Sequence, residues 1–233
     1  MQLTKQKGFT LVEIAIVLVI VGLLIGGVLK GQEMITNAKL KRIESDNAGV
    51  AAAMFSYQDR YLQLPGDDGN ATSRFNVYFD PVVDGGQGWV AGQADGDGDG
   101  VIGDGNDWKT VIQGTTPWTA GTSAEETSKF FGHLRSAGLI PGGSGVDAAR
   151  PTSAYGGLIG IQNGSLGIAG HAVIFGQIEG PVGRILEARL DDGAADTGRI
   201  QSNDSATDNM NDGTVPGSAT YDDDTRYDMA FRL

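Results

Sequence analysis

Acidic residues alternate with glycine in one short stretch, residues 95–107, which reads DGDGDGVIGDGND. Asp95, Asp97 and Asp99 take every second position, and a glycine follows them where a sharp turn is needed. With a backbone carbonyl from Val101, this spacing fits the first eight positions of an EF-hand calcium loop. Calcium prefers hard oxygen ligands in a flexible loop, so these residue types predict a Ca²⁺ site.

The stretch departs from a true EF-hand in two ways. Its twelfth position is Asn106, where the EF-hand has a bidentate glutamate, and the preceding GQGWVAGQA is a poor helix former. Asp104 and Asp107 are therefore the candidates for the missing carboxylate. Two interpretations stay open. One is a calcium loop whose cation relieves the repulsion between neighbouring aspartates, and the other is a solvated Asp-Gly turn tract that resists aggregation.

One more carboxylate stands in an unusual place. Residues 9–29 are apolar, glycine or threonine, with the exception of Glu13. As a helix this run rises about 31 Å, which matches the hydrocarbon thickness of a bilayer. A carboxylate at membrane depth costs on the order of 2.5 kcal/mol or more and usually marks a functional pairing. The alternative is that Glu13 lies near enough to the interface to stay hydrated.

A secretory signal peptide is the first alternative for this segment, because Lys5 and Lys7 precede it. Signal peptides have about 7–15 apolar residues and then small residues at a cleavage site. Here the run is longer, continues to Lys30 and has no A-x-A pattern. Gly22 and Gly26 add a GxxxG spacing, a weak signal for close approach of a second helix. The segment therefore predicts a retained membrane anchor.

Residues 7–13, KGFTLVE, together with the apolar span, resemble the prepilin signal of the type IV filament superfamily, which comprises type IV pilins and type II secretion pseudopilins. The resemblance implies that a membrane prepilin peptidase cuts between Gly8 and Phe9 and methylates the new amino terminus at Phe9. It also implies that Glu13 pairs with the Phe9 amine of a neighbouring subunit during assembly. An ammonium within reach offsets the cost of burying the carboxylate.

The resemblance implies a fold, a location and partners. The expected fold is an α+β pilin-like lollipop, in which a long N-terminal helix packs on a small antiparallel sheet with long Gly/Asp-rich loops. The expected location is a single pass through the bacterial inner membrane with the head in the periplasm, followed by a periplasmic or extracellular filament. Counting Lys and Arg favours the opposite orientation, and the resemblance overrules that count. The expected partners are other pilins or pseudopilins, as homo-oligomer or hetero-oligomer, the prepilin peptidase, the inner-membrane assembly platform and the membrane.

Apolar residues recur at steps of mostly 3, 4, 7 or 8 between residues 32 and 61, which predicts an amphipathic helix that continues the membrane span. An unbroken helix over 9–61 would be about 80 Å long. Its aromatic residues Phe55, Tyr57 and Tyr61 are expected to dock it on the sheet of the head. The expected organisation is a leader at 1–8, a transmembrane and filament-core helix at 9–29, its amphipathic continuation at 30–61 and a globular pilin-like head at 62–233.

The head is expected to be rich in turns, since most of the 37 glycines lie beyond residue 65 and are often paired with aspartate. Ser123 and Glu126 resemble a capping box that opens a helix ended by Gly138. Pro181 is expected to open a second helix that ends at residues 191–193. Strands are expected at 154–161, 166–176, 198–202 and 229–233.

We expect neither a catalytic site nor a nucleic-acid partner. The chain has no cysteine, and it lacks a nucleophile elbow, a phosphate loop and a zinc-binding helix. His133 and His171 are expected to be packed or surface histidines. The formal net charge is −12 and the acidic excess lies beyond residue 64, so the head should repel phosphates.

A filament subunit is therefore the favoured function, either in pilus assembly or, as a pseudopilin, in type II protein secretion. One alternative is a minor pilin that serves adhesion, motility or DNA uptake. Another is a membrane-tethered binding module whose anchor is never processed.

Overall fold

The computed structural model describes residues 10–75, 95–103, 108, 123–142, 150–205 and 220–233. The chain divides into two compact units, Met1–Lys41 and Arg42–Leu233. The first unit is helical throughout its described part, and the second holds the sheet and the other helices. The finer boundaries expected after residues 8, 29 and 61 stay predictions.

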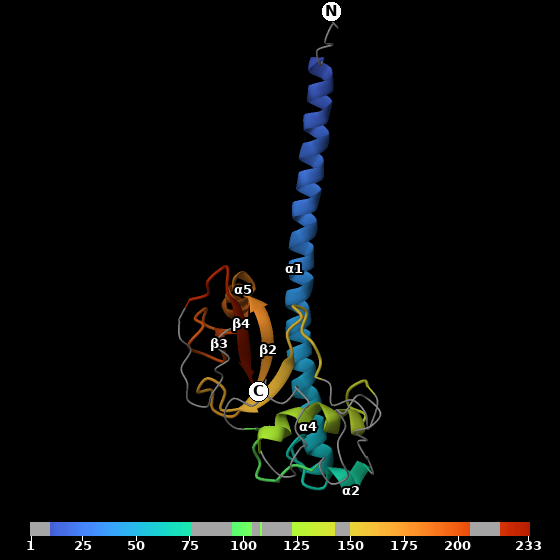
Figure 1. Ribbon diagram of the computed structural model, residues 1–233, viewed down its shortest axis with the longest axis vertical. Helices are drawn as coiled ribbons and strands as arrows, with labels where there is room; N and C mark the ends of the chain where they lie inside the picture. The colour runs from blue at the N-terminus through green and yellow to red at the C-terminus, as the bar shows by residue number, and fades with distance from the viewer. Residues whose placement is uncertain (1–9, 76–94, 104–107, 109–122, 143–149, 206–219) are drawn as a thin grey trace, which may run out of the picture. The chain divides into compact units, whose positions relative to one another are not determined.

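Helix α1 spans Leu11–Tyr61, a single helix of 51 residues (Figure 1). The long N-terminal helix expected from the apolar and amphipathic patterns is thereby confirmed. It begins directly after Thr10 and ends where Leu62 takes a left-handed conformation with φ of 57°. Pro65 comes four residues after Tyr61, the last residue of the helix, and a proline there disfavours a further turn.

The second unit is built on a four-stranded antiparallel sheet with the strand order β1-β2-β4-β3. Figure 1 shows β2, β4 and β3 side by side, with α5 at one end. The long helix and this small sheet confirm the expected α+β pilin-like layout. The strands are β1 (Ile159–Asn163), β2 (His171–Glu179), β3 (Ile200–Asp204) and β4 (Arg226–Arg232).

Among the described residues, three shorter helices accompany the sheet. Helix α4 (Ser123–Ser136) packs against β1, and α5 (Gly180–Leu190) packs against β2 and β4. Both were expected from the sequence, and α5 does carry a proline in its first turn. The short α2 (Ala71–Phe75) was not expected, because its ATSRF sequence has no apolar periodicity to reveal it.

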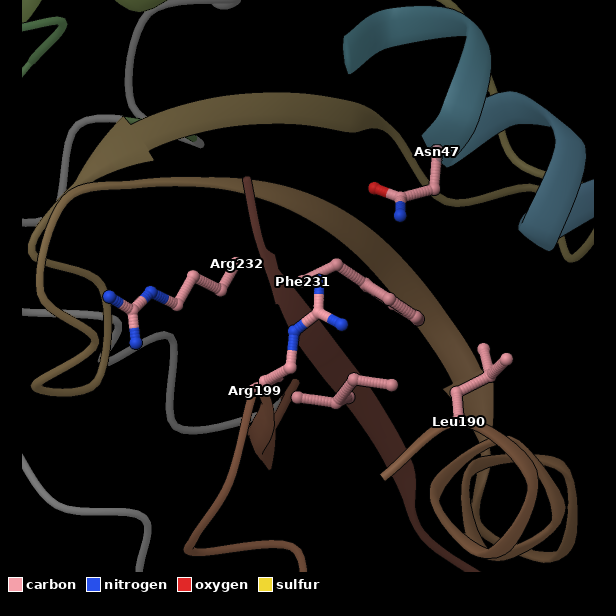
Figure 2. A pocket seen from close by; sticks show the side chains of 6 residues that line it. Asn47, Leu190, Arg199, Phe231 and Arg232 are labelled. Carbon is pink, nitrogen blue, oxygen red and sulfur yellow. The ribbon is translucent and has the colours of Figure 1, made fainter. Parts of the chain in front are cut away.

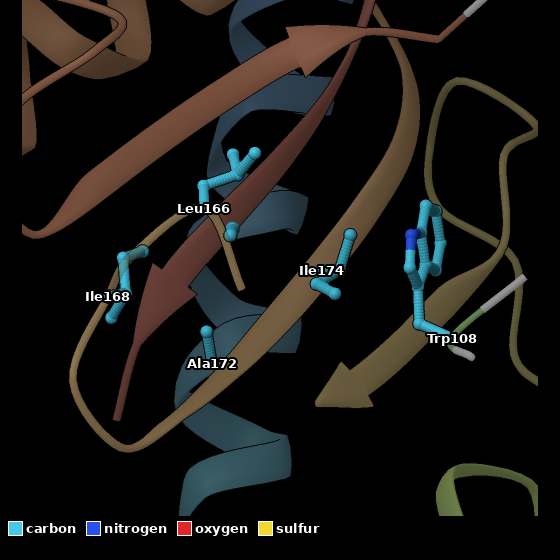
Figure 3. Packing of buried hydrophobic residues seen from close by; sticks show 6 residues of the cluster. Trp108, Leu166, Ile168, Ala172 and Ile174 are labelled. Carbon is cyan, nitrogen blue, oxygen red and sulfur yellow. The ribbon is translucent and has the colours of Figure 1, made fainter. Parts of the chain in front are cut away.

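One face of the sheet is covered by a compact apolar cluster. Ala172 and Ile174 of β2 lie on this face, and Leu166 and Ile168 fold over them from the preceding loop (Figure 3). Trp108 completes the cluster beside β1. Its ring can approach because position 160 is glycine, where a Cβ would lie 2.9 Å from the Trp108 ring. The sheet therefore has a packed core on this side.

The opposite face of the sheet is also buried. It carries Val173 and Phe175 from β2, and Phe231 from β4 pairs with Val173 in the register. The ring of Phe231 meets that of Phe175 edge to face, with centroids 5.2 Å apart. Both faces of this antiparallel sheet are thus covered by other parts of the chain.

The expectation that Phe55, Tyr57 and Tyr61 dock α1 on the sheet of the head is wrong in two respects: among the described residues the ring partners of Tyr57 and Tyr61 lie in α2 and α4 rather than in the sheet, and Phe55 is exposed. Tyr57 is fully buried, whereas Phe55 is 54% exposed. The reason is geometric, since residues two apart on a helix point about 200° apart. Tyr57 and Tyr61, four apart, do share a face, and both contact the ring of Phe75 in α2.

Candidate functional site

The first candidate site is the start of α1, where Thr10 and Glu13 cap the helix reciprocally. The Thr10 backbone N–H and hydroxyl each donate to Glu13 Oε2 at 2.9 Å, and the Glu13 N–H donates to Thr10 Oγ1 at 3.3 Å. This is a capping box, in which a threonine and a glutamate three residues on satisfy each other's backbone groups. Glu13 therefore has a role within its own chain.

The apolar part of α1 is exposed in the described part of the chain. Among the described helices, α1 is long and apolar enough to cross a membrane, with a mean hydropathy of 2.8 over its most apolar stretch. None of that stretch is buried. A Cβ added at Gly22, Gly26 or Gly27 would meet no atom within 4 Å, so nothing inside the chain requires these glycines. Gly8 and Phe9, the predicted processing residues, lie outside the described residues.

The second candidate site is a group of four carboxylates, which we call the acidic group: Asp67, Asp97, Asp99 and Glu126. One carboxylate oxygen from each residue lies within 4.8 Å of the others. Asp97 and Asp99 come from the predicted calcium stretch, whereas Asp67 follows α1 and Glu126 lies in the first turn of α4. The fold thus gathers acids from three separate parts of the sequence.

Asp67 is held in place by the backbone of the aspartate stretch. Its Oδ1 accepts the Gly98 N–H at 2.7 Å, and its Oδ2 accepts the Gly100 N–H at 2.9 Å. Gly96 passes so close that a Cβ there would lie 2.3 Å from the Asp67 Cα. Gly98 and Gly100 have φ values of 79° and 88°, which glycine adopts without strain. The glycines of the tract therefore let the loop wrap around a buried acid.

Glu126 ties the same loop to α4. Its Oε1 accepts the Asp97 N–H at 3.0 Å and its Oε2 accepts the Gly103 N–H at 3.4 Å. The side chain is fully buried, and this burial, with Asp97 and Asp67 nearby, raises the pKa of Glu126 to about 8. Burial raises the pKa of Asp67 as well. Both shifts arise mainly from burial, which disfavours the charged forms of Asp67 and Glu126.

Of the other predicted calcium ligands, Asp95 and Val101 belong to the described part of the chain, and Asp104 and Asp107 do not; the roles of all four stay predictions. Asp95 is not part of the acidic group among the described residues, and its Oδ1 accepts the Thr72 N–H at 2.7 Å at the start of α2. The Val101 N–H donates to Asp99 Oδ1 at 2.8 Å. Asp104 and Asp107 fall outside the described residues, so their part in a metal site stays a prediction.

The far end of the loop is anchored on the sheet. His171, the first residue of β2, accepts the Ile102 N–H at its Nε2 over 3.0 Å, and the Ile102 carbonyl accepts the Asn163 N–H at 3.0 Å. Burial lowers the pKa of His171, which favours the neutral ring that can accept this bond. Both predicted histidine placements hold, since His133 is buried in α4 and His171 lies in a strand.

The acidic group fits a calcium ion by chemistry and spacing. Calcium takes six to eight oxygen ligands at about 2.3–2.6 Å, so oxygens around one ion lie at most about 5 Å apart. The four carboxylates meet that limit. Each carboxylate oxygen has a second lone pair, so the hydrogen bonds already made leave coordination possible. Backbone carbonyls and water would complete the shell.

Three residues of these sites were missed from the sequence. Thr10 could have been found, because T-x-x-E before an apolar run is a capping-box signature. Glu126 was assigned to the cap of its own helix, and no local signal tells that its carboxylate serves a loop more than 20 residues earlier. Asp67 was assigned to a loop, and only the tertiary fold brings it to the aspartate stretch.

The structure also has a small pocket between α1 and the sheet edge, with a volume of about 130 Å³ (Figure 2). Asn47 points into it from α1, and Arg199 and Phe231 point into it from the other side. Pockets for small-molecule ligands usually measure roughly 300–1,000 Å³. This one is too small to suggest a substrate site. Its lining residues are Asn47, Leu190, Arg199, Ile200, Phe231 and Arg232.

The long apolar N-terminal helix and the small antiparallel sheet define a pilin-like α+β protein. Residues 3–29 match the family model of the prokaryotic N-terminal methylation motif. This motif is the signature of type IV pilins and pseudopilins, so the expected family resemblance is confirmed. The match concerns the N-terminal segment and does not extend into the head. No curated protein and no solved structure matches the chain.

The motif indicates the general class of the protein, its assembly and its membrane anchor. It belongs to a family of structural rather than enzymatic proteins. It implies processing by a peptidase and assembly with other pilins into filaments. Together with the apolar helix, it fits a protein anchored in the inner membrane by a single pass.

Proposed function

We propose that this protein is a structural subunit of a type IV pilus-like filament, cleaved between Gly8 and Phe9 and N-methylated at Phe9. The observation that carries the proposal is that the methylation motif at residues 3–29 overlaps the start of a single 51-residue helix, whose most apolar stretch is not buried in the part of the chain that the structure describes. Such a helix needs either lipid or other helices around it. A subunit that moves from membrane to filament core uses both in turn.

Glu13 gives the proposal its mechanism. The cut leaves the Thr10 amide intact, so the capping box survives processing and holds the Glu13 carboxylate at the very start of the helix. A second acceptor oxygen and further lone pairs remain for the ammonium that cleavage creates at Phe9. Pairing with a neighbour's ammonium offsets the cost of a carboxylate among apolar helices. Assembly is then favoured only for processed subunits.

Incubation with prepilin peptidase tests the proposal. Membranes that contain the full chain should lose residues 1–8, and mass spectrometry should find a methyl group on Phe9. Gly8→Val should block the cut, since a branched side chain replaces the glycine at the scissile bond. Lys30→Ala, which changes a residue beyond the apolar run, should be processed normally. An intact leader in the unchanged protein would favour the membrane-tethered binding module instead.

Pilins and pseudopilins share the methylation motif, and we propose two candidate roles for this filament: the pseudopilin of a type II secretion system or the subunit of a pilus. A deletion strain separates them: loss of secreted proteins with normal twitching supports the first role, and loss of twitching, adhesion or DNA uptake supports the second. A minor subunit would produce either defect while contributing little protein to sheared filaments. A strain that loses neither function would contradict both.

We also propose that the acidic group binds Ca²⁺. Millimolar calcium should raise the thermal unfolding midpoint of the full chain in detergent and slow hydrogen exchange at the Gly98 and Gly100 amides. Glu126→Gln should remove most of the exchange protection at the Gly98 and Gly100 amides, whereas Glu179→Gln should not, because Glu179 makes an exposed ion pair with Arg226. If calcium changes neither the midpoint nor the exchange of these amides, the aspartate stretch is a solvated turn tract.

A further inference from the structure

A second set of acids, outside the stretch singled out from the sequence, gathers at the C-terminal end of α5. One carboxylate oxygen from each of Glu187, Asp191 and Asp192 lies within 4.8 Å of the others. Glu187 is in the last turn of α5, and the two aspartates directly follow that helix. The end of a helix carries a partial negative charge from its unpaired carbonyls, which makes three carboxylates there unfavourable by themselves.

Glu187 is the unusual member of this group because it is fully buried. Its Oε1 accepts the Tyr221 hydroxyl at 2.8 Å, and that hydroxyl in turn accepts a bond from Ser202 Oγ at 2.8 Å. Its Oε2 has no hydrogen-bond partner among the described residues. A buried carboxylate oxygen without a partner costs about 1–3 kcal/mol, and more if it is charged. A ligand bound at this site would give Glu187 Oε2 the partner that it lacks among the described residues.

The following loop holds the two aspartates in place. Asp191 Oδ2 accepts the backbone N–H groups of Arg199 and Ile200, and Gly198 passes so close that a Cβ would collide with that oxygen. Asp192 accepts the Ala194 N–H at 2.9 Å and the Thr197 hydroxyl at 2.6 Å. These bonds preorganise both carboxylates before any ligand arrives.

The Arg199 side chain does not neutralise these three carboxylates, although the Arg199 backbone N–H donates to Asp191. Figure 2 shows the Arg199 side chain directed into the pocket between α1 and the sheet. Asp192 is exposed and Asp191 partly so, which opens the group to solvent on one side while Glu187 closes it on the other. An ion from solution can therefore reach the two aspartates, and one Glu187 carboxylate oxygen lies within 4.8 Å of their ligand oxygens.

We propose that Glu187, Asp191 and Asp192 form a binding site for a divalent cation of the calcium class. Three carboxylates offer the hard oxygens that calcium prefers, and oxygens within 4.8 Å of one another can share one ion at about 2.4 Å. The ion satisfies Glu187 Oε2 and offsets the negative end of α5. The site is independent of the proposed filament function.

Terbium luminescence tests the site in the full chain in detergent, with the acidic group disabled by Asp97→Asn and Asp99→Asn. Tyr221 is the natural sensitiser, because its hydroxyl lies 2.8 Å from Glu187 Oε1. We expect saturable Tb³⁺ luminescence that excess Ca²⁺ displaces, together with a calcium-dependent rise in the unfolding midpoint. Glu187→Gln keeps the size of the side chain and should weaken binding at least tenfold.

Two further variants keep the result interpretable. Asp192→Asn changes an exposed side chain and should also weaken binding without affecting folding, which circular dichroism checks. Asp223→Asn is the matched control, since Asp223 is an exposed acid paired with Arg184 at 2.6 Å and should bind Tb³⁺ normally. Equal luminescence and equal calcium stabilisation in all three variants would overturn the proposal.

Discussion

The N-terminal half of α1 and the sheet of the head are both rich in large apolar residues, but these residues are exposed in the helix and buried in the sheet. Leu18 and Leu23 in the helix are 66% and 74% exposed, whereas Ile161 and Phe175 in the sheet are fully buried. The head covers both faces of its sheet from within the chain. The helix has no such cover, so its surface must meet lipid or another helix. The difference separates a self-sufficient fold from a segment that is completed only by its surroundings.

The strongest test of this contrast is the carboxylate in the uncovered helix. Glu13→Ala should leave membrane insertion intact and reduce the yield of sheared filaments at least tenfold, because the neighbour's ammonium loses its partner. Immunoblots of membrane and sheared fractions measure both. Glu33→Ala is the matched control, since Glu33 lies on the same helix in an exposed pair with Lys30 at 2.8 Å. Normal filament yield from Glu13→Ala would refute the pairing.

The head should lose stability when a residue of its own apolar core is truncated. Trp108→Ala removes a ring that is 1% exposed and should lower the free energy of unfolding of the head by about 3–5 kcal/mol. Phe55→Ala removes a ring that is 54% exposed and should change it by less than about 0.5 kcal/mol. Denaturant titration of the full chain in detergent, followed by near-UV circular dichroism, compares the two. Similar losses would mean that Trp108 is not a core residue.

Burial should also determine how much each ion pair in the head contributes to the free energy of unfolding. Asp68 is fully buried, accepts the Tyr57 hydroxyl at 2.7 Å and pairs with Arg74 at 3.0 Å. Asp68→Ala leaves these donors unsatisfied and should cost about 3 kcal/mol. Asp223→Ala breaks an exposed pair with Arg184 and should cost at most about 1 kcal/mol. The same denaturant titration measures both, and a reversed order would contradict the buried network.

The smallest effect is expected at the cap of α1. Thr10→Ala removes the side-chain half of the capping box, worth about 1 kcal/mol, which corresponds to roughly fivefold faster hydrogen exchange in the first turn. Thr36→Ala, whose hydroxyl only bonds the Gln32 carbonyl within the helix, should leave that turn unchanged. Filament yield should fall by no more than about twofold. A loss as large as that of Glu13→Ala would show that the cap, and not the charge, governs assembly.

Elements with local signals were predicted well. The apolar run and its periodic continuation predicted α1, and Pro181 with the acidic stop predicted α5. Strand limits were less accurate: β1 begins at Ile159, whereas residue 154 was expected, because a tight turn over 152–158 precedes the ladder. The exposure of Phe55 beside the buried Tyr57 followed from helix geometry and could have been foreseen.

By itself, the sequence determined the N-terminal motif, because glycine, phenylalanine, glutamate and the apolar span lie within one short segment. It also predicted that Asp97 and Asp99 are ligands of a hard cation, which stays a proposal. Only the tertiary structure decided which residues complete that group, since Asp67 and Glu126 come from positions about 30 residues to either side. Long-range pairing depends on how helices and sheet pack. No local sequence pattern indicates such pairing. The hydrogen bond from the Tyr221 hydroxyl to the buried Glu187 could likewise not be predicted from local sequence.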